Sequence, residues 1–272
     1  MDLIFFDLDG TLLNNASEIT PFTRDTLRLL GKSDIAYTVA TGRTMLSATQ
    51  ILNGHDFNLP QIYNNGVTVW DPRAQSLTLE NLLNEDEVST IIELALSYGI
   101  TPFVNVIEEK HHYIFHSETL HDVEKDLVQK YFSRTDAKLL PLQTLPAKSQ
   151  VTNISMIANA STITKMWTKL NTFDSLVAYS GSALEGKQYK WMDVHHRLAN
   201  KGSAVNNLKQ QLGAKNIICF GDGDNDLSMF ALADECYAPE NAHPEIKETA
   251  SAVIGHNHED GIAHFLRERF SL

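Results

Sequence analysis

Two short apolar segments, far apart in the sequence, each lead directly into a run rich in aspartate. The first covers residues 3–6 and is followed by residues 7–11 (DLDGT), and the second covers residues 216–220 and is followed by residues 221–226 (GDGDND). Short apolar runs bounded by turn residues are typical of strands buried inside a parallel sheet. Open α/β sheets bind ligands beyond the carboxyl ends of their strands, so both acidic runs are expected at one functional edge.

The rest of the chain alternates β-prone runs with amphipathic helices at its two ends. This alternation predicts parallel βαβ units and an α/β fold, with a doubly wound parallel (Rossmann-like) core sheet. Near residue 80 the pattern changes to strands and helices typical of a separate α+β unit. We therefore expect a core made of residues 1–80 and 187–272, with a strand at residues 189–194, and an inserted α+β cap domain at residues 81–186.

Charge and composition limit the function classes. The chain has 272 residues with 22 Lys and Arg against 34 Asp and Glu, a formal net charge of −12. This balance argues against nucleic-acid or anionic-membrane partners, which favour clustered basic residues. The two cysteines, Cys219 and Cys236, are too few for a disulfide framework or a cysteine zinc site. Without a signal-like amino terminus or a long apolar span, we expect a cytoplasmic protein; its oligomeric state is not indicated.

The acidic runs contain the residue types needed for group-transfer chemistry. Asp7 and Asp9 are separated by one residue, so one carboxylate can act as a nucleophile while the other transfers a proton. Asp222, Asp224 and Asp226 repel one another unless a cation or hydrogen-bond donors lie among them. An EF-hand calcium loop does not fit the second run, because the required Gly and Glu are absent from its sixth and twelfth positions. For each run taken alone, acidic residues that only form a turn or cap a helix remain the simpler alternative.

Two further segments could bind an anion. Thr41, Gly42 and Arg43 follow a predicted strand, where a hydroxyl and free amides at a helix start suit phosphate, although Thr41 could be an ordinary helix cap. Lys201 and Gly202 open a predicted helix, and a cation at that end opposes the helix dipole. This conflict suggests a function for Lys201, with a surface lysine as the alternative.

Taken together, these four segments resemble the four ordered motifs of the haloacid dehalogenase (HAD) superfamily of phosphatases. The motifs lie at residues 7–11, 41–43, 201–202 and 221–226. The turn at Asn65-Gly66, the large insertion, and the tail segments at residues 241–244 and 259–261 resemble the Cof-type subgroup. The resemblance covers the two core segments, whereas the inserted unit carries little recognisable signal.

The resemblance implies a Mg²⁺-dependent phosphatase that hydrolyses a small phosphorylated metabolite, such as a sugar phosphate or a cofactor phosphate. Asp7 would be the nucleophile that forms an aspartyl-phosphate, and Asp9 would be the general acid and base. Asp7, the backbone carbonyl of Asp9, and Asp222 would hold the metal ion, with Asp226 supporting them. The residues implied in phosphate binding are Thr41, Gly42, Lys201 and Asn225. The cap domain would select the substrate.

Two alternatives remain at this point. A phosphomutase or phosphotransferase would use the same aspartyl-phosphate but pass the group to another hydroxyl. A non-enzymatic phospho-acceptor or metabolite-binding module is disfavoured by Asp9, because a protein that must retain its phosphate does not benefit from an acid and base beside the nucleophile.

Overall fold

The computed structural model describes residues 1–108, 111–130, 136–183 and 185–272, and the chain divides into two compact units. The core unit combines residues 1–78 with residues 200–272, and the inserted unit covers residues 79–199. The expected boundary at residue 187 is therefore wrong. The strand β11 (Tyr189–His196) pairs antiparallel with two strands of the inserted unit, and its Met192 and Val194 lie in that unit's hydrophobic core.

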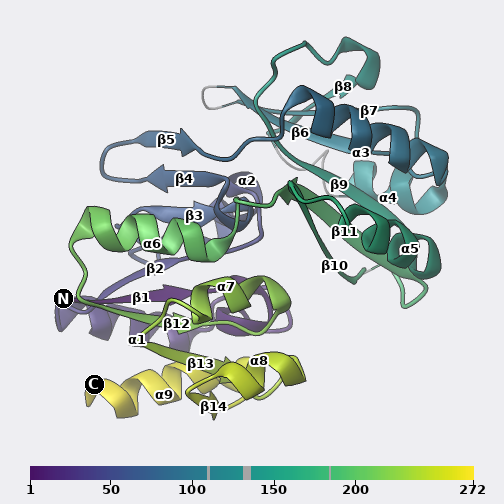
Figure 1. Ribbon diagram of the computed structural model, residues 1–272. Helices are drawn as coiled ribbons and strands as arrows, with labels where there is room; N and C mark the ends of the chain where they lie inside the picture. Colours follow the sequence, from purple (N-terminus) through teal and green to yellow (C-terminus); the bar gives the residue numbers. More distant parts are fainter. Residues whose placement is uncertain (109–110, 131–135, 184) are drawn as a thin grey trace. The chain divides into compact units, whose positions relative to one another are not determined.

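The core unit is built on a five-stranded parallel sheet, as the alternating pattern predicts (Figure 1). Its strands in spatial order are β14 (Ala252–Ile254), β13 (Glu235–Pro239), β12 (Asn216–Phe220), β1 (Asp2–Phe6) and β2 (Ala36–Val39). All four pairings are parallel. The chain moves outward from β1 in one direction to β2 and later in the other direction from β12 to β14. The carboxyl ends of β1 and β12 therefore form the switch point at which such sheets bind ligands.

Helices cover both faces of this sheet, because alternate residues of each strand point to opposite sides. In β1, Ile4 and Phe6 pack on one face while Leu3 and Phe5 pack on the other. The first face is covered by α1 (Pro21–Lys32), α2 (Met45–Leu52) and α9 (Gly261–Phe270). The second face is covered by α6 (Lys201–Leu212), α7 (Leu227–Phe230) and α8 (Pro244–Thr249). This arrangement is the doubly wound architecture expected from the sequence.

A small second sheet follows α2. It contains β3 (Gln61–Tyr63), β4 (Thr68–Asp71) and β5 (Ser76–Leu79), with β3 and β4 antiparallel. The connection between β3 and β4 is the turn Asn64–Gly66, in which Asn64, Asn65 and Gly66 all have positive φ. Asparagine and glycine adopt this left-handed backbone most readily, so the Asn-Asn-Gly sequence explains the tight turn.

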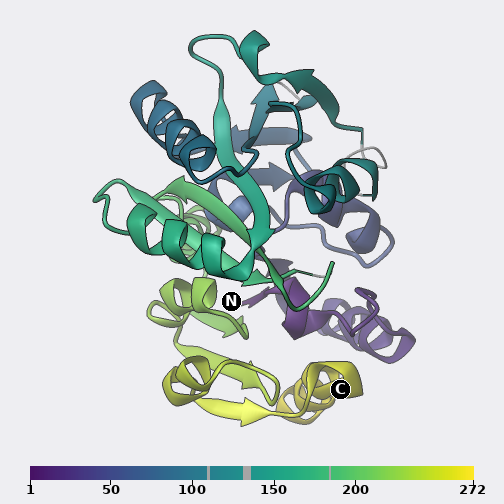
Figure 2. The same ribbon diagram turned by 90° about the vertical axis from the view of Figure 1, so that its right-hand side faces the viewer.

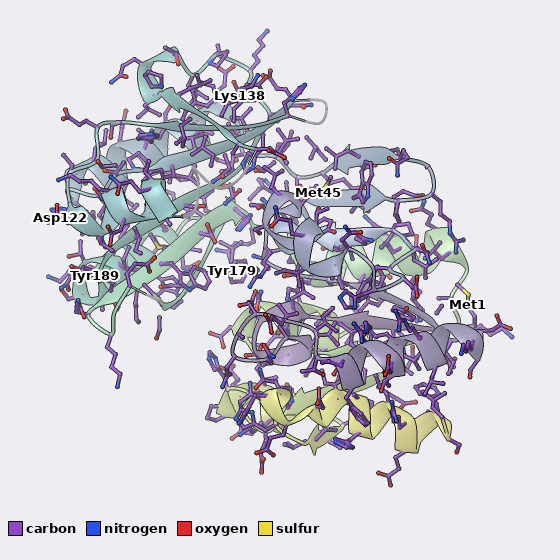
Figure 3. The ribbon with its side chains drawn as sticks, turned by 180° about the vertical axis from the view of Figure 1, so that it is seen from behind. Met1, Met45, Asp122, Lys138, Tyr179 and Tyr189 are labelled. Atoms are coloured by element: carbon purple, nitrogen blue, oxygen red, sulfur yellow. The ribbon has the colours of Figure 1, made fainter. Side chains whose placement is uncertain are left out.

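The inserted unit is a six-stranded sheet with helices, which confirms its α+β class. The strands in spatial order are β10 (Leu176–Ser182), β11, β9 (Val151–Asn159), β6 (Phe103–Glu108), β7 (His111–His116) and β8 (Lys138–Pro141). Helices α3 (Glu85–Ser97) and α5 (Ala160–Leu170) share one hydrophobic core with this sheet and contact each other (Figure 2). Figure 3 labels Asp122 at the start of α4 (Asp122–Lys130) and Lys138 at the start of β8. The sequence pattern predicts this charged helix around residues 118–131, and its expected end at residue 131 lies outside the described residues.

No helix among the described residues combines the length and the apolar composition needed to cross a bilayer.

Candidate active site

The loop after β1 brings the first acidic run against the second. Asp7 keeps an extended backbone, and its N–H donates to the carbonyl of Phe220 on β12 (2.9 Å). Residues 8–12 then form one wide turn in which Gly10 has φ +72°. A Cβ on Gly10 would lie 2.3 Å from Oδ2 of Asp222. Gly10 is therefore required both for the left-handed backbone and for the close approach of the two loops.

Three carboxylates gather where the loops meet. Oxygen atoms of Asp7, Asp222 and Asp226 all lie within 4.8 Å of one another. Asp7 and Asp226 are almost completely buried. The Thr11 hydroxyl donates to Oδ1 of Asp222 (3.0 Å), and Oδ2 of Asp226 accepts the backbone N–H groups of Asp222 and Gly223. The two strand ends thus converge, as their positions in the sheet predict.

Lys201 contacts two carboxylates of this cluster. It opens α6 directly after the cap residue Asn200, and its side chain is 0% exposed. Its Nζ donates to Oδ1 of Asp7 and to Oδ1 of Asp226, each at 2.6 Å. Burial lowers the pKa of the Lys201 ammonium, but the charges of Asp226 and Asp7 outweigh this effect and hold that pKa above its ordinary value. The alternative of a surface lysine is therefore wrong.

The cluster is short of positive charge. Burial raises the pKa of Asp7 well above its ordinary value, and the carboxylates of Asp226 and Asp222 add to this effect against the opposing charge of Lys201. Burial and the charge of Asp226 raise the pKa of Asp222 to about 6. With every group ionised, three carboxylates face one ammonium, so two negative charges remain. Oxygen donors with this excess charge suit a hard divalent cation.

The carboxylate of Asp9 lies outside this cluster. It forms a two-pronged ion pair with Arg43, whose Nε donates to Oδ2 (2.6 Å) and whose Nη2 donates to Oδ1 (2.5 Å). The side chain of Asp9 is 54% exposed, compared with 23% for Arg43. The fixed fork of the guanidinium therefore orients the Asp9 carboxylate on the open side of the loop. The sequence predicts the motif that contains Arg43, but it does not predict this contact between Arg43 and Asp9.

Asn65 connects the remaining motif residues. The N–H of Asn65 donates to the carbonyl of Thr41 (3.0 Å), and Nδ2 of Asn225 donates to Oδ1 of Asn65 (2.9 Å). A Cβ on Gly42 would lie 3.3 Å from the same Oδ1. Thr41 is buried, and its hydroxyl accepts the backbone N–H of Arg43 (3.1 Å).

The structure thus places Thr41, Gly42 and Asn225 around Asn65. The Asn-Asn-Gly sequence predicts a turn at Asn65, but the contact of Asn65 with Asn225 depends on the tertiary fold.

The chain is similar to known proteins over nearly its whole length. The sequence model of the haloacid dehalogenase-like hydrolases matches residues 4–266. The chain is 27% identical to the 5-amino-6-(5-phospho-D-ribitylamino)uracil phosphatase of Bacillus subtilis, over 100% of this chain and 99% of the relative. It is 28% identical to the HMP-PP phosphatase of Serratia proteamaculans, over 97% and 94%.

A solved haloacid dehalogenase-like hydrolase from B. subtilis has the same fold, with a TM-score of 0.80 at 23% identity over 98% of this chain and 99% of that one. The family match covers both segments of the core unit and the inserted unit between them. The chain therefore belongs to the haloacid dehalogenase-like hydrolases of the Cof type, and it is a phosphomonoester hydrolase.

Proposed function

We propose that this enzyme is a Mg²⁺-dependent phosphatase that hydrolyses a small phosphorylated metabolite through an aspartyl-phosphate. The observation that carries the proposal is the buried lysine, held 2.6 Å from both Asp7 and Asp226 beside Asp222 at the switch point of the sheet. A nucleophilic carboxylate must approach an anionic phosphate, so positive charge has to be concentrated at that place. The phosphatase names of the relatives support the same reaction class.

Asp7 and Asp9 have complementary roles in the proposed reaction. A carboxylate oxygen of Asp7 forms a bond to phosphorus while the bond from phosphorus to the ester oxygen breaks, and Asp9 gives its proton to that leaving oxygen. A water oxygen then attacks phosphorus and gives a proton to Asp9 as the bond to Asp7 breaks. Inorganic phosphate is released, and both carboxyl groups return to their initial state.

The surrounding residues supply charge and orientation. Asp7, Asp222, Asp226 and the backbone carbonyl of Asp9 would hold Mg²⁺, which when bound supplies positive charge next to the phosphate. Lys201 adds a fixed positive charge and holds one oxygen of Asp7 in place. The phosphate oxygens would be bound by Thr41, Gly42, Lys201 and Asn225. This division of roles fits phosphoryl transfer, which depends mainly on positioning and charge compensation.

The inserted unit is proposed to select the substrate. The four motifs lie in the core unit, so contacts specific to one metabolite must come from other parts of the chain. The relatives are named for a phosphorylated ribitylaminouracil and for HMP-PP. A sugar phosphate or a cofactor phosphate is the corresponding substrate class for this chain.

Release of inorganic phosphate tests the proposal. Purified protein is incubated with p-nitrophenyl phosphate and with a panel of phosphorylated metabolites, with Mg²⁺ or with EDTA. We expect phosphate release that requires Mg²⁺ and is lost in Asp7→Asn, because an amide oxygen is a poor nucleophile. The matched control is Asp224→Asn, an exposed acid of the same second run, which should keep its activity.

Two results would contradict the proposal. One is the absence of free phosphate from every ester, and the other is equal release by Asp7→Asn and the unchanged enzyme. An isomerised phosphate ester in place of free phosphate would instead identify a phosphomutase.

A further inference from the structure

The loop between β13 and α8 contacts both acidic runs. Nδ2 of Asn241 donates to the carbonyl of Gly10 (2.7 Å), in the turn that follows Asp7. Two residues further on, the backbone N–H of His243 donates to the carbonyl of Asp222 (3.0 Å). One short segment of the chain therefore holds the two loops whose carboxylates form the cluster.

A second asparagine fixes the orientation of Asn241. The backbone N–H of Asn257 donates to Oδ1 of Asn241 (3.1 Å), while Nδ2 of Asn257 donates to the carbonyl of Leu13 (2.8 Å). The amide of Asn241 thus has an N–H donor at its oxygen and a carbonyl acceptor at its nitrogen, which allows only one of its two flips. Gly10 and Leu13 lie in the turn and at its end, so both asparagines brace the same loop.

We propose that Asn241, oriented by Asn257, is a positioning residue that sets the spacing of the two acidic loops and thereby the affinity of the cluster for a divalent cation. This inference rests on the proposed function, because it concerns the same metal site. Asn241 acts through the backbone of Gly10, next to Asp9, and its own chain segment reaches Asp222. Groups that hold the ligands of a metal without touching it typically change metal affinity by about 10- to 100-fold when removed.

The geometry around Gly10 makes the spacing of the two acidic loops sensitive to the loss of one hydrogen bond. Gly10 has a left-handed backbone, and its missing side chain already leaves the loop pressed against Asp222. A turn of this kind relaxes when the hydrogen bond to its carbonyl is lost, and relaxation moves the first loop relative to the second. Because Asn241 is only partly buried, water can hydrate the freed carbonyl of Gly10 without holding it in position, so the loss of Asn241 affects the site more than the folding of the unit.

The experiment compares Asn241→Ala and Asn257→Ala with the full-length unchanged protein. Mg²⁺ binding is measured by titration calorimetry, melting temperature by circular dichroism, and kcat and KM with p-nitrophenyl phosphate. The matched control is Asn171→Ala in the inserted unit, because Asn171 also donates to and accepts from the backbone, in its case that of Ala178.

We expect Asn241→Ala to weaken Mg²⁺ binding about tenfold and to lower kcat more than it changes KM. The control should lose a similar amount of thermal stability with Mg²⁺ affinity unchanged. Asn257→Ala keeps the backbone N–H that orients Asn241 and loses only the contact of its side chain with Leu13, so we expect it to weaken Mg²⁺ binding less than Asn241→Ala does.

Mg²⁺ affinity within twofold of the unchanged protein in Asn241→Ala would overturn the inference, as would a loss of affinity in Asn257→Ala as large as that in Asn241→Ala. A wild-type chain that binds no Mg²⁺ would overturn it as well. The calorimetric readout needs no substrate. A protein whose Mg²⁺ affinity falls in Asn241→Ala but which releases no phosphate would therefore refute the proposed reaction while supporting this inference.

Discussion

Replacing Lys201 with methionine removes the one ammonium from the acidic cluster while keeping a side chain of similar length. Lys201 is fully buried and contacts Asp7 and Asp226 at 2.6 Å each. Removing one partner from a buried ion pair destabilises a protein by about 3–5 kcal/mol, because the remaining charges stay buried without compensation. For a unit of this size, a loss in that range lowers the melting temperature by on the order of 10 °C.

The loss in Lys201→Met should depend on pH in a defined direction. Without the ammonium, the pKa of Asp7 in the folded state rises further above its unfolded value of 3.8. The folded protein then binds a proton more readily than the unfolded chain, so the penalty is fully present above the folded pKa and shrinks as the pH falls. The difference in unfolding free energy between the variant and the unchanged protein should therefore be larger at pH 7.5 than at pH 5.

Urea unfolding at both pH values, without added metal, measures this difference. The control is Lys209→Met, because Lys209 pairs with Asp234 at 3.3 Å on the surface, where such pairs contribute about 1 kcal/mol or less. A Lys201→Met protein that differs from this control by less than about 1 kcal/mol at pH 7.5 would show that the acidic cluster does not depend on the buried ammonium for its stability.

Three further substitutions test the roles of His112, Arg43 and Gly10. Burial lowers the pKa of His112 from 6.5 to about 4, so the protein loses stability as the pH falls through this range, by about 3 kcal/mol at the lower end. His112→Gln should therefore flatten the pH dependence of the urea midpoint. An unchanged pH dependence in this variant would contradict the role of His112. Arg43→Ala should alter the unfolding free energy by less than about 1 kcal/mol and lower kcat about tenfold or more, because Asp9 loses its orienting fork; a wild-type kcat would contradict this role. Gly10→Ala should abolish Mg²⁺ binding, because its Cβ would collide with Asp222. Gly54 has a similar positive φ but open space around it, so Gly54→Ala should only lower the melting temperature. Calorimetry of both variants separates steric conflict from backbone strain.

The sequence predicts most of the core sheet because its signals are local, although it does not predict the strand β13 (Glu235–Pro239). The apolar runs at residues 3–6 and 216–220 and the helices between strands are each readable within a few residues. The boundary at residue 187 fails for the opposite reason. The alternating Met192 and Val194 of β11 suit any half-buried sheet, and nothing local shows that the strand pairs with β9 and β10 in the inserted unit.

The same difference between local and long-range signals applies to the residues of the candidate active site. Asp7 and Asp222 could be identified because each follows an apolar strand, and Lys201 because a cation at a helix start conflicts with the helix dipole. Asn241 and Asn257 could not be assigned a role in this way. They act on backbone carbonyls of residues more than 200 positions away in sequence, and only the folded chain brings these groups together.

Crystals grown with Mn²⁺ in place of Mg²⁺ would show directly whether the two acidic loops share one metal ion, because anomalous scattering locates the ion without reference to activity. We expect one strong anomalous peak between the carboxylates of Asp7 and Asp222. Mn²⁺ bound only at exposed acids elsewhere, with these two carboxylates making no contact to an ion, would contradict it.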